Sequence, residues 1–119
     1  LPHKQTILPF LKSLDSSAKI IGAVNCVYKG KGYNTDWIGF LETIKNYDLS
    51  LNNKNCIIIG AGGAARAIAY ALIKKGIKSI SIKNRSVEAE QKFLKWINNL
   101  HPKNNLNQNP ERNAAILWT

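Results

Sequence analysis

Three small residues, Gly60, Gly62 and Ala65, fit the spacing G-x-G-x-x-G/A where a β-branched run ends and an alanine-rich stretch begins. At such a strand-to-helix turn the first glycine allows the sharp bend, the second lets the backbone approach a pyrophosphate, and the third small residue lets helix and strand pack closely. The helix dipole would face the anion. A packing corner without a ligand is the alternative. The residues expected to bind a cofactor here are Gly60, Ala61, Gly62, Gly63 and Ala64.

The next apolar run ends in Asn84, Arg85 and Ser86, where dinucleotide-binding units that use NAD carry a carboxylate for the ribose 2′-hydroxyl. The sequence has no acidic residue at this point. A guanidinium with two neutral hydrogen-bonding groups, preceded by Lys83, suits a 2′-phosphate, which a carboxylate would repel. We therefore expect NADP rather than NAD, bound by Asn84, Arg85 and Ser86. The alternative is that Arg85 is one more solvated cation on a basic protein.

Hydrophobic periodicity and turn residues predict the elements that position these groups. Before residue 50 they are a tight turn at 2–4, a short helix from about Pro9, a hairpin around 29–32 and a helix over 36–46. The polar stretch 48–55 is the expected domain boundary. After it come a strand over 55–59, a helix over 62–75 ended by Gly76, a strand over 78–83 and a helix over 87–100. Residues 101–113 are expected to be loop, and the last six residues to be strand-like.

The composition excludes several classes of protein. The 119 residues are 45% hydrophobic and 20% charged, as in a soluble folded protein. The net charge of +10 suits an anionic partner, but the lysines are scattered without interleaved aromatics, so no nucleic acid is expected. No apolar run approaches the roughly 18 residues of a membrane span, so we expect a cytoplasmic protein without a membrane partner. Cys26 and Cys56 lack metal or disulfide spacing and are expected to be reduced core thiols, with no metal site.

Three further polar residues, Lys4, Asn25 and Asp36, read alone as a surface lysine, a turn asparagine and a helix cap. Each stands in a short motif, however, and five such motifs occur in one order. Together they make the chain resemble the shikimate dehydrogenase family. The motifs are PHK at 2–4, IGAVN at 21–25, GYNTD at 32–36, GAGGAA at 60–65 and NRS at 84–86.

The resemblance implies reversible NADP-linked oxidation of shikimate to 3-dehydroshikimate, a step of aromatic amino-acid biosynthesis that needs no metal. It implies that Lys4 is the acid/base group, that Asp36 lies beside it and hydrogen-bonds the substrate, and that Asn25 contacts the ring hydroxyls. An alcohol that loses hydride must also lose a proton, and a lysine held by a carboxylate can take it. Lys4 and Asp36 are the expected catalytic residues, and all three are expected to bind substrate.

The chain also departs from the family pattern. Cys26 replaces a threonine, and Val87, Glu88 and Ala89 follow NRS where NADP-binding members often have a second basic residue. A quinate/shikimate dehydrogenase relative that uses NAD or NADP therefore stays open. So does a non-catalytic nucleotide-binding remnant.

The length departs from the family pattern as well, because family members are much longer. The expected fold is α/β: residues 1–49 end a substrate domain, and a helix joins them to the first half of a Rossmann-type NADP domain at 50–119. We expect weak stability and little turnover from the chain alone, and a homodimer is possible.

Overall fold

A two-residue turn, Lys29–Gly30, bends residues 26–33 into the predicted hairpin. In this computed structural model, which describes residues 3–107 and 114–118, strands β2 (Cys26–Tyr28) and β3 (Lys31–Tyr33) are antiparallel. The turn between them places Lys29 and Gly30 at φ angles of 51° and 79°, the left-handed pair that a two-residue hairpin needs. A short strand, β1 (Ser13–Leu14), is absent from the prediction and pairs parallel to β3.

The segment before the hairpin differs from the prediction. The short helix expected from about Pro9 is a single 3₁₀ turn, Leu8–Phe10, because the backbone is already extended at Leu11. Helix α1 (Ser16–Ile21) is not among the predicted elements. Its N-cap, Asp15, accepts a hydrogen bond from the Ser17 N–H, and Gly22 ends it at a φ of 73°. The first residue of the turn expected at 2–4 lies outside the described residues.

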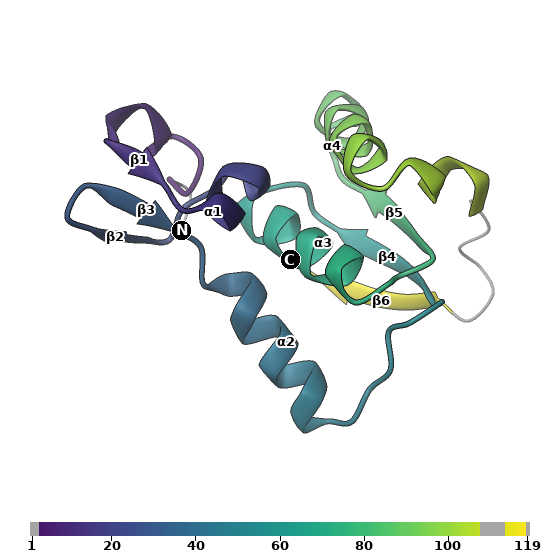
Figure 1. Cartoon of the computed structure of the whole chain (residues 1–119). Coiled ribbons are helices and arrows are strands. Elements are labelled where there is room, and N and C mark those ends of the chain that lie inside the picture. Colours follow the sequence, from purple (N-terminus) through teal and green to yellow (C-terminus); the bar gives the residue numbers. More distant parts are fainter. Residues whose placement is uncertain (1–2, 108–113, 119) are drawn as a thin grey trace.

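The second sheet carries the expected α/β pattern. Strands β4 (Asn55–Ile59), β5 (Ser79–Lys83) and β6 (Ala114–Trp118) are all parallel, in the order β5-β4-β6. Helices α3 (Gly63–Lys74) and α4 (Val87–Leu100) follow β4 and β5. The α/β fold class is confirmed, with the central strand leading into the glycine turn (Figure 1).

Two clusters of buried side chains hold these layers together. The larger one joins the sheet to helices α3 and α4 through Cys56, Ile58, Ala65, Ala69, Leu72, Ile77, Ile80, Ile82, Phe93 and Ile97. The smaller one joins helix α3 to the N-terminal part of the chain through Ile21, Ala23, Ala67 and Tyr70, with Trp37 packed edge-on against Tyr70. Because α3 presents alanines in both clusters, it can approach a sheet on one side and other helices on the other.

The predicted helix at residues 36–46 is confirmed as α2 (Asp36–Asn46), which contacts α3. It does not bury any of its 11 side chains fully. In Figure 1 it runs outward from the hairpin, and the chain then crosses back to β4. The stretch 48–55, where a domain boundary is expected, covers this crossing and the first residue of β4.

Two further expectations were wrong. Cys26 is exposed and only Cys56 is a buried thiol, because position 26 lies on the outer hairpin strand β2, where all three residues are exposed. Part of the expected loop after residue 100 is a 3₁₀ helix, Pro102–Asn107, and its later part, 108–113, lies outside the described residues. The Asn104 side chain pairs with the backbone of Ile80, accepting from the N–H at 2.6 Å and donating to the C=O at 3.1 Å, and so closes the edge of β5.

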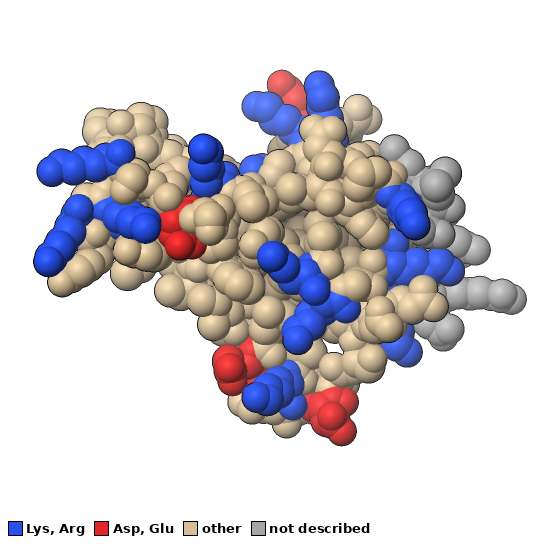
Figure 2. Space-filling model, in the orientation of Figure 1, with Lys and Arg blue, Asp and Glu red and all other residues tan. Residues whose placement is uncertain are grey.

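Lysine and arginine side chains are scattered over the face shown in Figure 2. Within the described residues, no helix is both long and apolar enough to cross a bilayer.

Candidate functional site

Three polar side chains that are far apart in sequence meet at the start of helix α2. The Lys4 ammonium forms an ion pair with Oδ2 of Asp36. The other carboxylate oxygen of Asp36 accepts from the amide nitrogen of Asn25 at 2.8 Å. The side chain of Lys4 is 14% exposed and that of Asp36 is 32% exposed. The structure therefore brings the predicted lysine, aspartate and asparagine into one partly buried cluster.

Two neighbouring residues, Asn34 and Thr35, frame this cluster. Asn34 is buried. Its side chain donates to the Ala23 C=O at 3.1 Å and accepts from the Asp36 N–H at 2.9 Å, thereby capping α2. Thr35 donates its N–H to the side-chain oxygen of Asn25 at 3.0 Å. An asparagine two residues before a helix is the sequence signal for such a cap. The N-cap residue itself, Thr35, makes no side-chain capping hydrogen bond.

The glycine turn lies against the same lysine. Gly60, at the carboxyl end of β4, has a φ of 116°, which only glycine adopts easily. Helix α3 begins at Gly63, where an added Cβ would lie 3.0 Å from Cβ of Lys4 and 3.4 Å from Cβ of Ala23. An added Cβ at Gly62 would meet no atom within 4 Å. A side chain at position 63 would therefore press on the lysine, whereas Gly62 faces open space.

Two hollows meet at Lys4. One, of about 250 Å³, is lined by Lys4 and residues 60–65, so it covers the glycine turn and the first turn of α3. The other, also about 250 Å³, is more apolar and is lined by His3, Lys4, Ile7, Val24, Asn25 and Val27. The first N–H groups of a helix have no partner within it, so the first hollow suits an anion. Lys4 thus lines both the hollow over the glycine turn and a second, separate hollow.

The predicted 2′-phosphate residues follow β5 at the same edge of the sheet. Since Ile59 pairs with Lys83, the segments beginning at Gly60 and Asn84 leave the sheet side by side. Arg85 is exposed. Ser86 caps α4 by accepting from the Ala89 N–H at 3.1 Å. Its hydroxyl thus already has a structural use.

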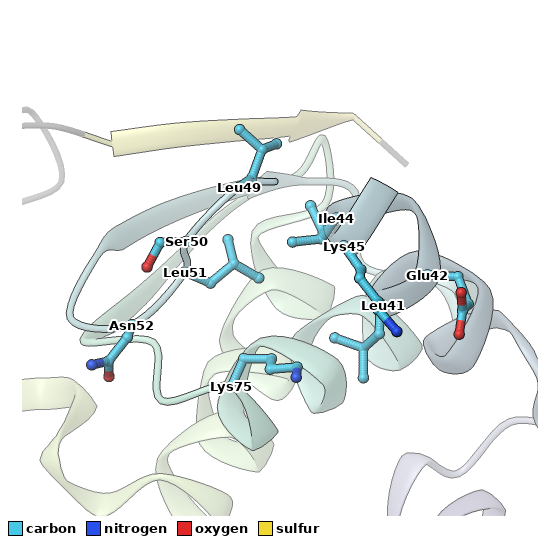
Figure 3. Close-up of a pocket in the computed structure, with 9 residues that line it drawn as sticks. All are labelled: Leu41, Glu42, Ile44, Lys45, Leu49, Ser50, Leu51, Asn52 and Lys75. Atoms are coloured by element: carbon cyan, nitrogen blue, oxygen red, sulfur yellow. The ribbon is translucent and has the colours of Figure 1, made fainter. Parts of the chain in front are cut away.

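A larger hollow of about 390 Å³ lies at the other end of α3, lined by Leu41, Glu42, Ile44, Lys45, Leu49, Ser50, Leu51, Asn52 and Lys75 (Figure 3). It contains none of the predicted site residues. Size alone therefore does not locate the site.

The parallel sheet with its glycine turn defines a Rossmann-type fold. A family model for shikimate / quinate 5-dehydrogenase matches residues 42–116. The NADP(+)-dependent shikimate dehydrogenase of Methanosphaera stadtmanae is 46% identical over 103 residues, which are 83% of this chain and 36% of that protein. This chain belongs to the shikimate / quinate 5-dehydrogenase family.

Solved structures agree with this assignment. Shikimate dehydrogenase from Aquifex aeolicus is 41% identical, with a TM-score of 0.72 over 81% of this chain and 37% of that one. The Thermus thermophilus enzyme, in complex with NADP(H) and shikimate, is 35% identical, with a TM-score of 0.70 over 82% of this chain and 38% of that one. The chain thus spans somewhat more than a third of the length of these relatives.

Proposed function

We propose that the chain carries the proton-transfer pair and the pyrophosphate-binding turn of an NADP-linked shikimate dehydrogenase, which interconverts shikimate and 3-dehydroshikimate. One observation carries the proposal: Lys4 is paired with Asp36 and lines both the hollow over the glycine turn and the hollow beside Asn25. A cofactor in the first and a substrate in the second would meet at this side chain. In this proposal residues 1–49 belong to the substrate domain and residues 50–119 to the NADP domain.

The roles of the three polar residues follow from their contacts. In the direction of ketone reduction, the Lys4 ammonium donates a proton to the carbonyl oxygen. In the direction of alcohol oxidation, the neutral amine takes the hydroxyl proton, and the Asp36 carboxylate stabilises the ammonium that forms. Asn25 holds the second oxygen of Asp36 and contributes to binding of the ring hydroxyls.

The cofactor fits the residues present. The open space in front of Gly62 leaves room for a pyrophosphate against the start of α3. When bound there, NADP supplies the hydride acceptor. Arg85, exposed at the adjacent strand end, is the cation available for the 2′-phosphate.

Cofactor binding is tested on the chain itself. NADPH and NADH are titrated against ¹⁵N-labelled protein, and the amide resonances of the glycine turn are followed. We expect both to shift Gly62 and Gly63, with NADPH binding more tightly because of Arg85. Equal shifts spread over the lysine-rich surface, without saturation at the turn, would contradict the proposal.

Catalysis is tested by transplanting this chain into the Methanosphaera stadtmanae enzyme in place of the matching segment, which separates competence of these residues from turnover by the chain alone. Shikimate-dependent NADP reduction should persist, and Lys4→Ala should lower kcat by about 10²–10⁴-fold. Lys74→Ala, at an exposed lysine near the end of α3, is the matched control. Cofactor binding with no effect of Lys4→Ala would instead favour a non-catalytic nucleotide-binding remnant.

A second candidate is a quinate/shikimate dehydrogenase that accepts NAD as well as NADP. Ala89 stands in place of a further base, and Glu88 adds a carboxylate to the first turn of α4. Near-equal affinities for NADPH and NADH, together with quinate oxidation by the transplanted enzyme, would support this candidate over the first.

A further inference from the structure

The C-terminal end of helix α1 receives two side-chain hydrogen bonds from the nucleotide-binding part of the chain. The Trp96 indole N–H, on α4, donates to the Ile20 C=O at 3.2 Å. The Arg66 Nε–H, on α3, donates to the Ile21 C=O. The last carbonyls of a helix lack partners within it and carry the negative end of the dipole. An arginine and an indole from two other helices therefore satisfy the end of α1.

These two donors also contact each other. The Arg66 guanidinium carbon lies 4.1 Å from the centre of the Trp96 ring, within cation–π range. Trp96 is fixed in turn by an edge-on contact with buried Phe93. An added Cβ at Gly22, just after α1, would lie 2.8 Å from Nη2 of Arg66, so the guanidinium would have to shift. The guanidinium thus fits between α1 and α4.

Arg66 is also unusual in its charge environment. Burial lowers its pKa, and no carboxylate of the described residues forms an ion pair with it. A half-buried guanidinium without a carboxylate is costly unless its contacts compensate. The contacts that can do so are the α1 carbonyl and the Trp96 ring. The contacts of Arg66 with the end of α1 and with Trp96 are therefore candidates for a role beyond packing.

A short path leads from these contacts to the proposed catalytic lysine. Ala23, two residues after Ile21, packs against Gly63. The next N–H, of Val24, donates to the Lys4 C=O at 2.7 Å. A shift of the α1 end would therefore move the backbone that holds Lys4 relative to the glycine turn.

We propose that Arg66, together with Trp96, is a positioning residue that locks the end of α1 to helices α3 and α4 and so sets the place of Lys4 against the glycine turn. The consequence for hydride and proton transfer rests on the proposed function. The lock itself does not, because it is a property of the unliganded chain.

The experiment follows the amide resonances of Lys4, Asn25 and Asp36 in the unliganded ¹⁵N-labelled chain. Arg66→Lys keeps the charge but loses the planar face for Trp96, and Arg66→Met keeps the stem without a donor. Trp96→Phe keeps a ring without the N–H. Lys74→Ala is the control, because Lys74 lies on the same helix but over the Tyr70 ring, at 5.4 Å, rather than at the end of α1.

We expect the three resonances to shift strongly in Arg66→Met and Trp96→Phe, less in Arg66→Lys, and not in Lys74→Ala. The shifts in the Arg66→Met/Trp96→Phe double variant should be smaller than the sum of the single shifts, because both act through one contact. Wild-type resonances at Lys4 in Arg66→Met would overturn the proposal, as would additive shifts. A chain that shows the shifts but binds no NADPH would contradict the proposed function and leave the lock standing.

Discussion

Gly62→Ala separates cofactor binding from folding more sharply than any other change in this chain. Gly62 is the N-cap of α3, with φ −90° and ψ −164°, an extended conformation that alanine adopts without strain. Its added Cβ would meet no protein atom within 4 Å. The methyl group would instead project into the space that the proposed pyrophosphate occupies.

The effect on folding is small because two terms oppose each other. Alanine restricts the unfolded chain and so stabilises the fold by about 0.4–1 kcal/mol, whereas it is a poorer N-cap than glycine by about the same amount. The effect on binding is larger. Loss of one hydrogen bond to a charged phosphate costs about 1.5–3 kcal/mol, which corresponds to roughly a 10–100-fold rise in Kd.

The assay pairs NADPH titration by isothermal calorimetry with urea unfolding of the same protein. Gly39→Ala is the control, since Gly39 lies within α2 and an added Cβ there also meets nothing within 4 Å. It should stabilise the helix by about 1 kcal/mol and leave NADPH affinity unchanged. Unchanged NADPH affinity in Gly62→Ala would refute the placement of the pyrophosphate at this turn.

The remaining predictions concern three separate features. Arg85→Ala should weaken the affinity for NADPH by about tenfold or more in calorimetry and leave the affinity for NADH unchanged, because only the 2′-phosphate loses a charged hydrogen bond. Burial raises the pKa of the Cys56 thiol to about 12 from 9.0, so above pH 9 only the unfolded thiol ionises. The free energy of unfolding should therefore fall by about 1.4 kcal/mol per pH unit in this range. This pH dependence should be absent in Cys56→Ala. Iodoacetamide should label exposed Cys26 before Cys56. Asn104→Ala strips two backbone groups of Ile80 of a partner and should lower stability in urea by about 1–3 kcal/mol for each.

The Rossmann-type half of the fold could be predicted well from the sequence because its signals are local. Three β-branched residues, a glycine turn and an alanine-rich stretch specify strand, turn and helix within a single short segment. Helix α4 is predicted with the bounds that the structure shows, since Ser86 caps it and its apolar positions keep helical spacing. The hairpin is equally readable from Lys29 and Gly30.

The elements that the sequence did not predict lack such local signals. Helix α1 has only six residues and depends on Asp15 and Gly22 at its ends. Strand β1 has two residues and exists only because β3 lies beside it. The exposure of Cys26 escapes prediction for the same reason: alternation shows that two faces exist, but not which of them another part of the chain covers.

The proposed site, too, could be predicted only in part from the sequence. Its residues can be named by motif, yet their meeting is a matter of tertiary structure, since the ion pair of Lys4 with Asp36 joins positions 32 apart. Asn34 escapes notice although it holds both Ala23 and Asp36, because its bonds are to backbone groups. Such a residue leaves no chemical signature in the sequence beyond its place before a helix.

The first turn of α3 makes several contacts with different parts of the molecule. Gly62 leaves space on the side of the proposed cofactor, Gly63 gives way to Lys4, and Arg66 reaches the end of α1. Gly63 and Arg66 are three residues apart, so they lie on one face of the helix, whereas Gly62 is its N-cap. Helix α3 therefore brings the proposed cofactor site, the lysine and the N-terminal part of the chain together at its first turn. Gly62→Ala should accordingly alter affinity for the cofactor, whereas substitutions at Gly63 and Arg66 should both alter the placement of Lys4 beside Asp36.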